Sequence, residues 1–198
     1  MPYLLLIFIS GKLIYTDEFF FKSYSTQFSE KAITDIIVLK GDFWWVTYFY
    51  TFIIILLRSN FSAICIHIGI MFKGIHLDYK KIYKTTLISE IVFLVAQITH
   101  SIILHQNIND LRVDNILEYF PLSVLGFIGI ENINAQWAIY PLQTANLFEV
   151  FYVIAIAWLL SKKWKPDFIE TLNIVIPSYG LGLLLWVTLV AFLTLQVS

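Results

Sequence analysis

A short series of polar side chains interrupts an otherwise apolar segment near the middle of the chain. Glu90, Gln97 and His100 follow one another at helical spacing and therefore project from one face of a helix. A polar face inside a membrane helix indicates a functional site, here a proton or ion relay, or a metal site joined by His67. The alternative is hydrogen bonding between helices, worth about 0.6–2 kcal/mol per contact.

Metal chemistry has little support from residue spacing. The segment contains no His-x3-His or Glu-x-x-His pair, which zinc sites on helices use. The chain also lacks a Gly-x-Ser-x-Gly motif, a phosphate-binding glycine loop and a His-Glu-x-x-His motif. We therefore expect no catalytic residue, no metal and no cofactor, and a protein that is not an enzyme.

Two further charges, Arg58 and Glu149, lie within apolar stretches and are candidate functional residues. Glu149 follows Gln143 and Asn146 near the expected outer end of a span. We expect it to pair with Arg112 or with polar groups of the outer segment. For Glu149, the simpler interpretation is a pairing that stabilises the structure. For the polar face of Glu90, Gln97 and His100, it is hydrogen bonding between helices.

The elements that must position these residues are long and nearly free of charge. An apolar fraction of 59% exceeds the roughly 45–50% of soluble domains. A bilayer about 30 Å thick needs about 20 apolar residues per helical span. The fold class predicted is therefore all-α, a polytopic transmembrane helical bundle. Its apolar stretches are Phe43–Phe72, Thr85–Asn109, Asn132–Leu160 and Thr171–Ser198.

The first stretch has two interpretations. As one helix it would be about 45 Å long with Arg58 at its centre, where an arginine costs several kcal/mol. A hairpin broken at Arg58-Ser59-Asn60 places the arginine at the outer interface instead. The sequence favours the hairpin, although both halves are short for a crossing. Five spans result, at about 43–57, 61–73, 85–106, 145–161 and 172–195.

Lysines indicate the orientation. They cluster at 73–84 and at 162–165, whereas the connection at 107–144 is mainly acidic. By the positive-inside rule the lysine-rich loops are cytoplasmic, which gives an N-in, C-out topology. Residues 107–144 are then an outer interfacial segment between parts of a transmembrane bundle at 43–198.

Residues 1–42 form a mostly polar N-terminal arm in this interpretation. Lys31–Lys40 has an amphipathic pattern typical of a helix lying on the membrane surface. In the last span, Ser178 and Gly182 form a small-xxx-small pair beside Pro177, which permits close helix packing. A static kink at this proline is a simpler interpretation than a transport hinge.

Two segments resemble a known family. Gly69–Phe93 ends a span in a lysine-rich loop that contains glycine, and in Tyr140–Lys165 the residues Asn146-Leu147-Phe148 enter a helix. Over residues 43–196 the chain is similar to a divergent bacterial member of the Yip family, the Ypt/Rab-interacting-protein-like five-helix membrane proteins. The resemblance implies five membrane helices and brings no catalytic residues.

Three functions are compatible with these features. The favoured one is a non-enzymatic structural or adaptor subunit of an assembly in the bacterial inner membrane. The alternative is a small transporter or lipid-handling protein that uses Glu90, Gln97 and His100. An intramembrane enzyme is the weakest. The expected partners are the lipid bilayer and a membrane protein or a second copy, and a net charge of −1 argues against nucleic acid.

Overall fold

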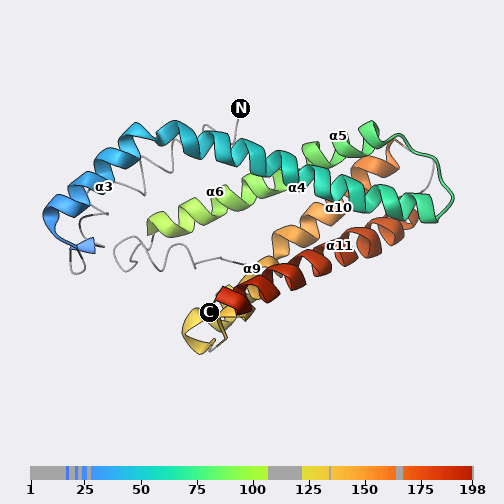
Figure 1. Cartoon of the computed structure of the whole chain (residues 1–198). Helices are drawn as coiled ribbons and strands as arrows, with labels where there is room; N and C mark the ends of the chain where they lie inside the picture. The colour runs from blue at the N-terminus through green and yellow to red at the C-terminus, as the bar shows by residue number, and fades with distance from the viewer. Residues whose placement is uncertain are drawn as a thin grey trace. The chain divides into compact units, whose positions relative to one another are not determined.

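The computed structural model describes residues 17, 21, 24–25, 28–106, 122–133, 135–163 and 167–197. Within these ranges the secondary structure is helical, and β-type pairing is limited to one isolated bridge between Ser123 and Asn146. The predicted all-α fold class is confirmed (Figure 1). The chain divides into unit 1, Met1–Ile54 with Leu94–Pro121, and unit 2, Ile55–Phe93 with Leu122–Ser198.

Helix α3, Glu30–Asp42, lies in unit 1 and contains the amphipathic stretch seen in the sequence. The Ser29 side chain caps it by accepting from the Ala32 amide over 3.4 Å. Ile33 is its buried residue. Burial lowers the pKa of Lys40, and the Asp17 carboxylate raises it in part. The helix was expected, but its placement on a membrane surface remains a prediction.

Helix α4 is one uninterrupted helix from Trp44 to Phe72, so the hairpin favoured by the sequence is wrong at Arg58. The helix stops where Gly74 adopts a positive φ of 70°. The Ile75 amide then donates to the Ile70 carbonyl over 3.3 Å, a bond typical of a glycine-terminated helix. The spans expected at 43–57 and 61–73 are therefore parts of a single element.

The expected span at 85–106 is longer and divided. Helix α5, Tyr79–Ser89, starts at Asp78, whose side chain accepts from the Lys80 amide over 3.1 Å. Helix α6, Ile91–Gln106, follows after a single turn residue, Glu90. The turn places a carboxylate, rather than an apolar side chain, at the junction of the two helices.

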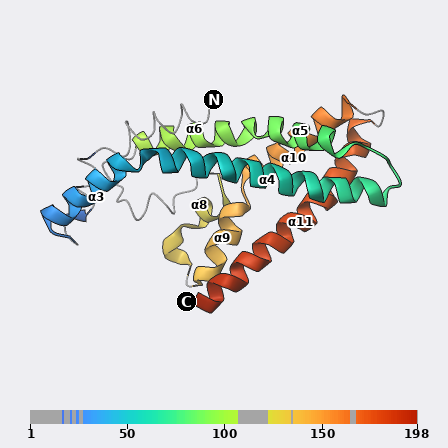
Figure 2. The same cartoon turned by 45° about the horizontal axis from the view of Figure 1, so that its top comes forward.

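The remaining helices belong to unit 2. They are α8 at Val124–Ile128, a 3-10 turn η1 at Ile130–Asn132, α9 at Gln136–Thr144, α10 at Leu147–Ser161 and α11 at Phe168–Val197. The Ser123–Asn146 bridge joins the residues that cap α8 and α10. Of the outer segment, residues 107–121 lie outside the described residues. Figure 2 shows α8 and α9 near the C-terminal end of α11.

Three helical segments are long and apolar enough to cross a membrane: Trp44–Phe72, Tyr79–Ile103 and Phe168–Gln196. The second of them takes α5 and α6 together across Glu90. Helix α10 is apolar but shorter, at 15 residues. Large apolar side chains cover their outer faces, including Phe72, Leu181 and Leu185. These features are those of a membrane protein, since lipid rather than water suits such faces.

Unit 2 has a core of buried side chains contributed by α4, α5, α10 and α11. Small residues let α4 approach α11. A methyl group added at Gly69 would collide with Ser178, and one added at Gly182 would collide with Cys65. The small-xxx-small pair expected at Ser178 and Gly182 therefore lies at a real helix–helix contact. Helix α11 continues through Pro177, whose missing amide removes one backbone bond without ending the helix.

Candidate functional site

The site begins with an ion pair between two helices of unit 2. Arg58 Nε donates to Glu90 Oε1 over 3.1 Å, and Arg58 Nη2 binds Glu90 Oε2. The pairing is bidentate, which matches the planar fork of a guanidinium to both oxygens of a carboxylate. The Glu90 side chain is 3% exposed and that of Arg58 33% exposed. It is the one ion pair that joins two residues within the described part of the chain.

Neighbouring side chains fix both partners. Ser59 Oγ donates to Glu90 Oε1 over 3.3 Å, so the carboxylate has a third donor. The Arg58 Cζ atom lies 3.7 Å from the centre of the Phe93 ring, a cation–π contact. Thr86 Oγ1 lies 2.9 Å from the Ser59 carbonyl oxygen and ties α5 to α4. Arginine and glutamate are thereby held in one geometry.

Tyr152 connects the pair to α10. Its hydroxyl donates to Ser62 Oγ over 3.2 Å, and Ser62 Oγ donates to the Arg58 carbonyl over 2.9 Å. The Tyr152 ring is completely buried between aromatic neighbours. Its centroid lies 4.9 Å from that of Phe93 and 5.6 Å from that of Tyr179, at inclined angles that aromatic pairs prefer.

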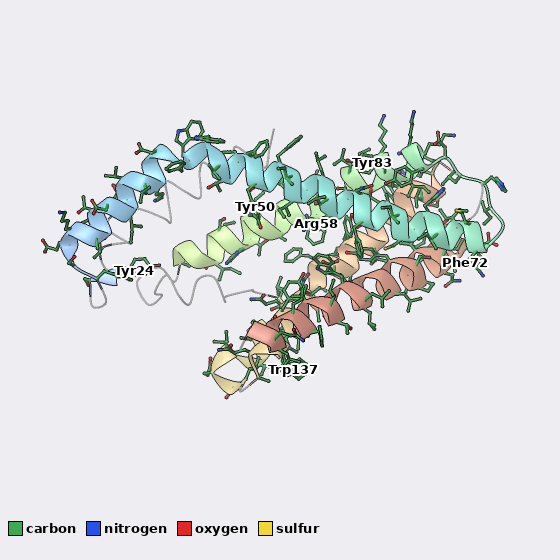
Figure 3. The ribbon with its side chains drawn as sticks, viewed as in Figure 1. Tyr24, Tyr50, Arg58, Phe72, Tyr83 and Trp137 are labelled. Carbon is green, nitrogen blue, oxygen red and sulfur yellow. The ribbon has the colours of Figure 1, made fainter. Side chains whose placement is uncertain are left out.

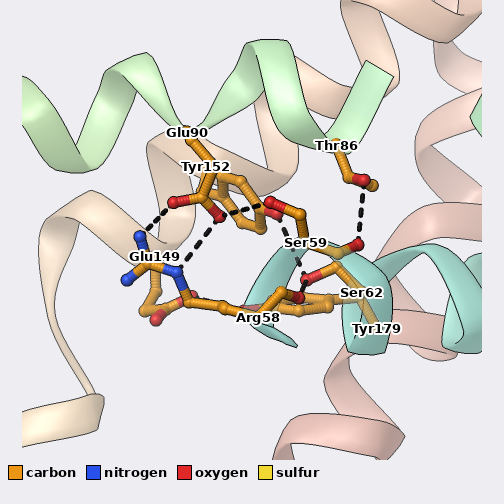
Figure 4. A network of polar contacts seen from close by, with 8 residues as sticks. All are labelled: Arg58, Ser59, Ser62, Thr86, Glu90, Glu149, Tyr152 and Tyr179. Carbon is orange, nitrogen blue, oxygen red and sulfur yellow. Dashed lines mark hydrogen bonds and ion pairs between the residues drawn. The ribbon is translucent and has the colours of Figure 1, made fainter. Parts of the chain in front are cut away.

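The second carboxylate lies in the first turn of α10. Tyr179, on α11, donates its hydroxyl to Glu149 Oε2 over 2.8 Å. The Asn146 side chain accepts from the Glu149 amide over 2.9 Å and so caps the helix. The Tyr179 ring packs against the Tyr152 ring, with centroids 5.6 Å apart, and so connects Glu149 to the residues around Arg58. Figure 4 shows these groups together, and we call them the polar cluster: Arg58, Ser59, Ser62, Thr86, Glu90, Glu149, Tyr152 and Tyr179.

The polar cluster contains two carboxylates and one guanidinium. A charge removed from water is costly unless it is paired and hydrogen-bonded. The Arg58–Glu90 pair meets this requirement, and Glu149 meets it in part through Tyr179. Chemically, such an arrangement can hold helices together, and the carboxylate outside the ion pair can exchange a proton or a cation.

The three residues expected to share a polar face lie at the turn between α5 and α6 and on α6. Glu90 is a turn residue whose carboxylate accepts hydrogen bonds from Arg58 and Ser59. Gln97 and His100 lie further along α6 and belong to unit 1, where both are half-buried. His67 packs its ring edge-on against Tyr79, with centroids 5.6 Å apart. No group of three or more potential metal ligands gathers within the described part of the chain.

Sequence reasoning found Arg58, Glu90 and Glu149 but not their partners. Glu149 binds Tyr179, whereas Arg112, its expected partner, lies outside the described residues. The hydroxyl groups of the cluster were missed altogether. Ser59 and Ser62 lie on consecutive turns beside Arg58, and this run of hydroxyl side chains in an apolar stretch was the available signal.

Comparisons with known proteins give no match: no family model, curated protein or solved structure corresponds to this chain.

Proposed function

We propose that this chain is a non-enzymatic integral membrane protein that acts as a structural or adaptor subunit of an assembly in the bacterial inner membrane. The observation that carries this proposal is the pairing within the polar cluster. Arg58 and Glu90 bind each other in a bidentate pair, and Tyr152 and Tyr179 donate to groups on neighbouring helices. Groups engaged in this way hold helices at fixed positions.

The proposal includes a likeness to the Yip family, which rests on the lysine-rich loop after Gly69 and on the helix entry at Asn146. It also includes a topology. If Trp44–Phe72 crosses the membrane once, four crossings replace five, with α10 as the shortest. Lysine-rich loops on the inner side then put both chain ends outside.

Photo-crosslinking in intact membranes tests the subunit role. A photoreactive amino acid is placed at Leu185, which is 68% exposed on α11, and at Val175, which is fully buried on the same helix. A subunit of an assembly gives a crosslinked product of higher mass from position 185 and none from position 175. If exposed positions along both α4 and α11 crosslink only to lipid at native expression levels, the chain is not a subunit.

A second function is favoured by the unequal charges of the polar cluster. Two carboxylates against one guanidinium leave Glu149 outside the ion pair, and such a group suits coupling to a proton or cation. The protein is then a small transporter. Its site includes Glu90, as the sequence suggested, with Arg58 and Glu149 as partners.

Ion flux into proteoliposomes distinguishes the two functions. In a transporter, Glu149→Gln abolishes proton-driven or sodium-driven flux while the helical circular dichroism spectrum stays unchanged. Tyr152→Phe removes a hydroxyl of the same cluster without changing its charge and serves as the control. If wild-type protein and Glu149→Gln leave the vesicles equally tight to both ions, the transporter function is rejected.

A further inference from the structure

Four helix ends lie at the same end of unit 2. Helices α4 and α10 finish there, at Phe72 and Ser161, and α5 and α11 begin there, at Tyr79 and Phe168 (Figures 1 and 2). Lysines outnumber acidic residues in this region. The described lysines are Lys73, Lys80, Lys81, Lys84, Lys162 and Lys163, and the acidic residues are Asp78, Asp167 and Glu170.

A hydrogen bond brings the two groups of lysines together. Lys163 Nζ donates to Thr85 Oγ1 over 3.1 Å, although the two residues are 78 positions apart in the chain. Thr85 is one helical turn from Lys81 and adjacent to Lys84, so all three lysines surround one turn of α5. We call Lys81, Lys84 and Lys163 the lysine patch.

In the part of the chain that the structure describes, none of the three ammonium groups forms an ion pair with a carboxylate. All three lysines are exposed. Lysines that lie together without a counter-charge attract an anion, because each ammonium repels its neighbours. The positive charge of the three lysines is therefore available to bind an anionic ligand.

The surroundings identify the kind of anion. Tyr79 and Tyr83 stack with ring centroids 6.3 Å apart, and Lys162 lies 3.6 Å over the Trp158 ring. Figure 3 shows Tyr83 and Phe72 at this end of the unit. Tyrosine and tryptophan beside the ends of apolar helices are typical of the depth of lipid headgroups. Basic side chains at this depth bind the phosphates of acidic lipids.

We propose that the lysine patch binds the phosphate headgroup of an anionic phospholipid. The lipid phosphate is bound by Lys81, Lys84 and Lys163, and its acyl chains lie along the apolar spans. This inference goes beyond the proposed function, because neither a subunit nor a transporter requires a preferred lipid.

Lipid selectivity tests the proposal directly. The purified protein is reconstituted in phosphatidylcholine bilayers that carry trace spin-labelled phosphatidylglycerol or spin-labelled phosphatidylcholine. Electron paramagnetic resonance then measures the fraction of each label held at the protein. We expect wild-type protein to bind phosphatidylglycerol in preference to phosphatidylcholine. In K81A/K84A the ratio of the two binding constants should fall about fivefold for each lysine removed. Salt at about 1 M should weaken the preference, since it shortens the Debye length to about 3 Å.

Two matched variants serve as controls. K81R/K84R keeps both charges and should keep the selectivity, whereas K31A/K40A removes two lysines of α3, outside the patch, and should cost less selectivity than K81A/K84A. Lys84→Gln alone, with an expected loss of about fivefold, gives the same test with a smaller perturbation. Equal binding of the two labelled lipids by wild-type protein would overturn the proposal. An equal loss of selectivity in K31A/K40A and K81A/K84A would also overturn it.

Discussion

Arg58 is stable within an apolar helix because Glu90 accepts from both arms of its guanidinium. The Phe93 ring covers the cation, and Ser59 supplies the carboxylate with a further donor. Charge-assisted bidentate bonds of this kind are about twice as strong as neutral ones. A pair held so completely is expected to be coupled, so that losing one partner harms the protein more than losing both.

Arg58→Leu leaves the carboxylate of Glu90 buried without its counter-charge. We expect the free energy of unfolding to fall by about 3 kcal/mol, in the range found when one member of a buried pair is removed. Reversible unfolding by sodium dodecyl sulfate in mixed micelles, followed by circular dichroism, measures the change.

The double variant Arg58→Leu/Glu90→Leu provides the control, because it removes both charges together. It should recover most of the stability lost in Arg58→Leu, since apolar replacements of buried pairs are often neutral. A double variant that is less stable than the single one by the full cost of a second mutation would show that the two side chains act independently.

The sequence identified each member of this pair but could not join them. A charge within an apolar run is visible in one dimension, and so Arg58, Glu90 and Glu149 were all found. Their pairing depends on which helices become neighbours, and Arg58 and Glu90 are 32 residues apart. Treating Arg58 as a charge without a partner also produced the error at α4, because an unpaired arginine favours a break.

At the scale of helices, small residues determine how closely α4 and α11 pack. Gly69 faces Ser178 and Gly182 faces Cys65, with no space for a methyl group at either glycine. Close backbone approach provides the van der Waals contact that drives helix association in lipid. The motif at Ser178 and Gly182 was visible in the sequence, but its partners on α4 were not.

Gly69→Ala should destabilise the protein by about 1–3 kcal/mol, because the added methyl group meets the Ser178 side chain. Gly180→Ala, at a helical position with open space, should instead be neutral or stabilising by up to about 1 kcal/mol. Unfolding in mixed micelles compares the two. A similar loss of stability in both variants would contradict a specific contact at Gly69.

Helix boundaries were predicted less well than helix type. The turn at Glu90 divides the predicted span at 85–106, and Asp78 starts it earlier than expected. Local capping determines both limits, whereas the sequence interpretation relied on average hydropathy. Where the apolar pattern was long and uniform, as over the last span expected at 172–195, helix α11 agrees with it closely.

At the scale of the whole molecule, the continuity of α4 affects which side of the membrane each end occupies. A hairpin at Arg58 would return the chain to its starting side, whereas the single helix, in the four-span topology proposed above, carries it across once. The proposed topology, with the lysine-rich loops inside, therefore puts the N-terminal arm outside, opposite to the orientation that the five-span interpretation favoured.

Labelling of single cysteines measures this orientation. In a Cys65→Ala background, cysteines replace Asp35, Lys80 or Glu131, all of which are exposed. A membrane-impermeant maleimide added to intact spheroplasts should label positions 35 and 131, and inside-out vesicles should expose position 80. If positions 35 and 80 are labelled in the same preparation, they lie on the same side of the membrane. In that case α4 does not cross once and the four-span topology is wrong.

The ion pair between α4 and α5 also concerns how the protein is made. Glu90 is synthesised 32 residues after Arg58, so α4 leaves the ribosome before its counter-charge exists. A lone arginine at a helix centre opposes release from the translocon into lipid by about 2.5–3.5 kcal/mol. Helix α4 is therefore expected to wait at the translocon until α5 follows, so that the two enter the bilayer as one biosynthetic unit.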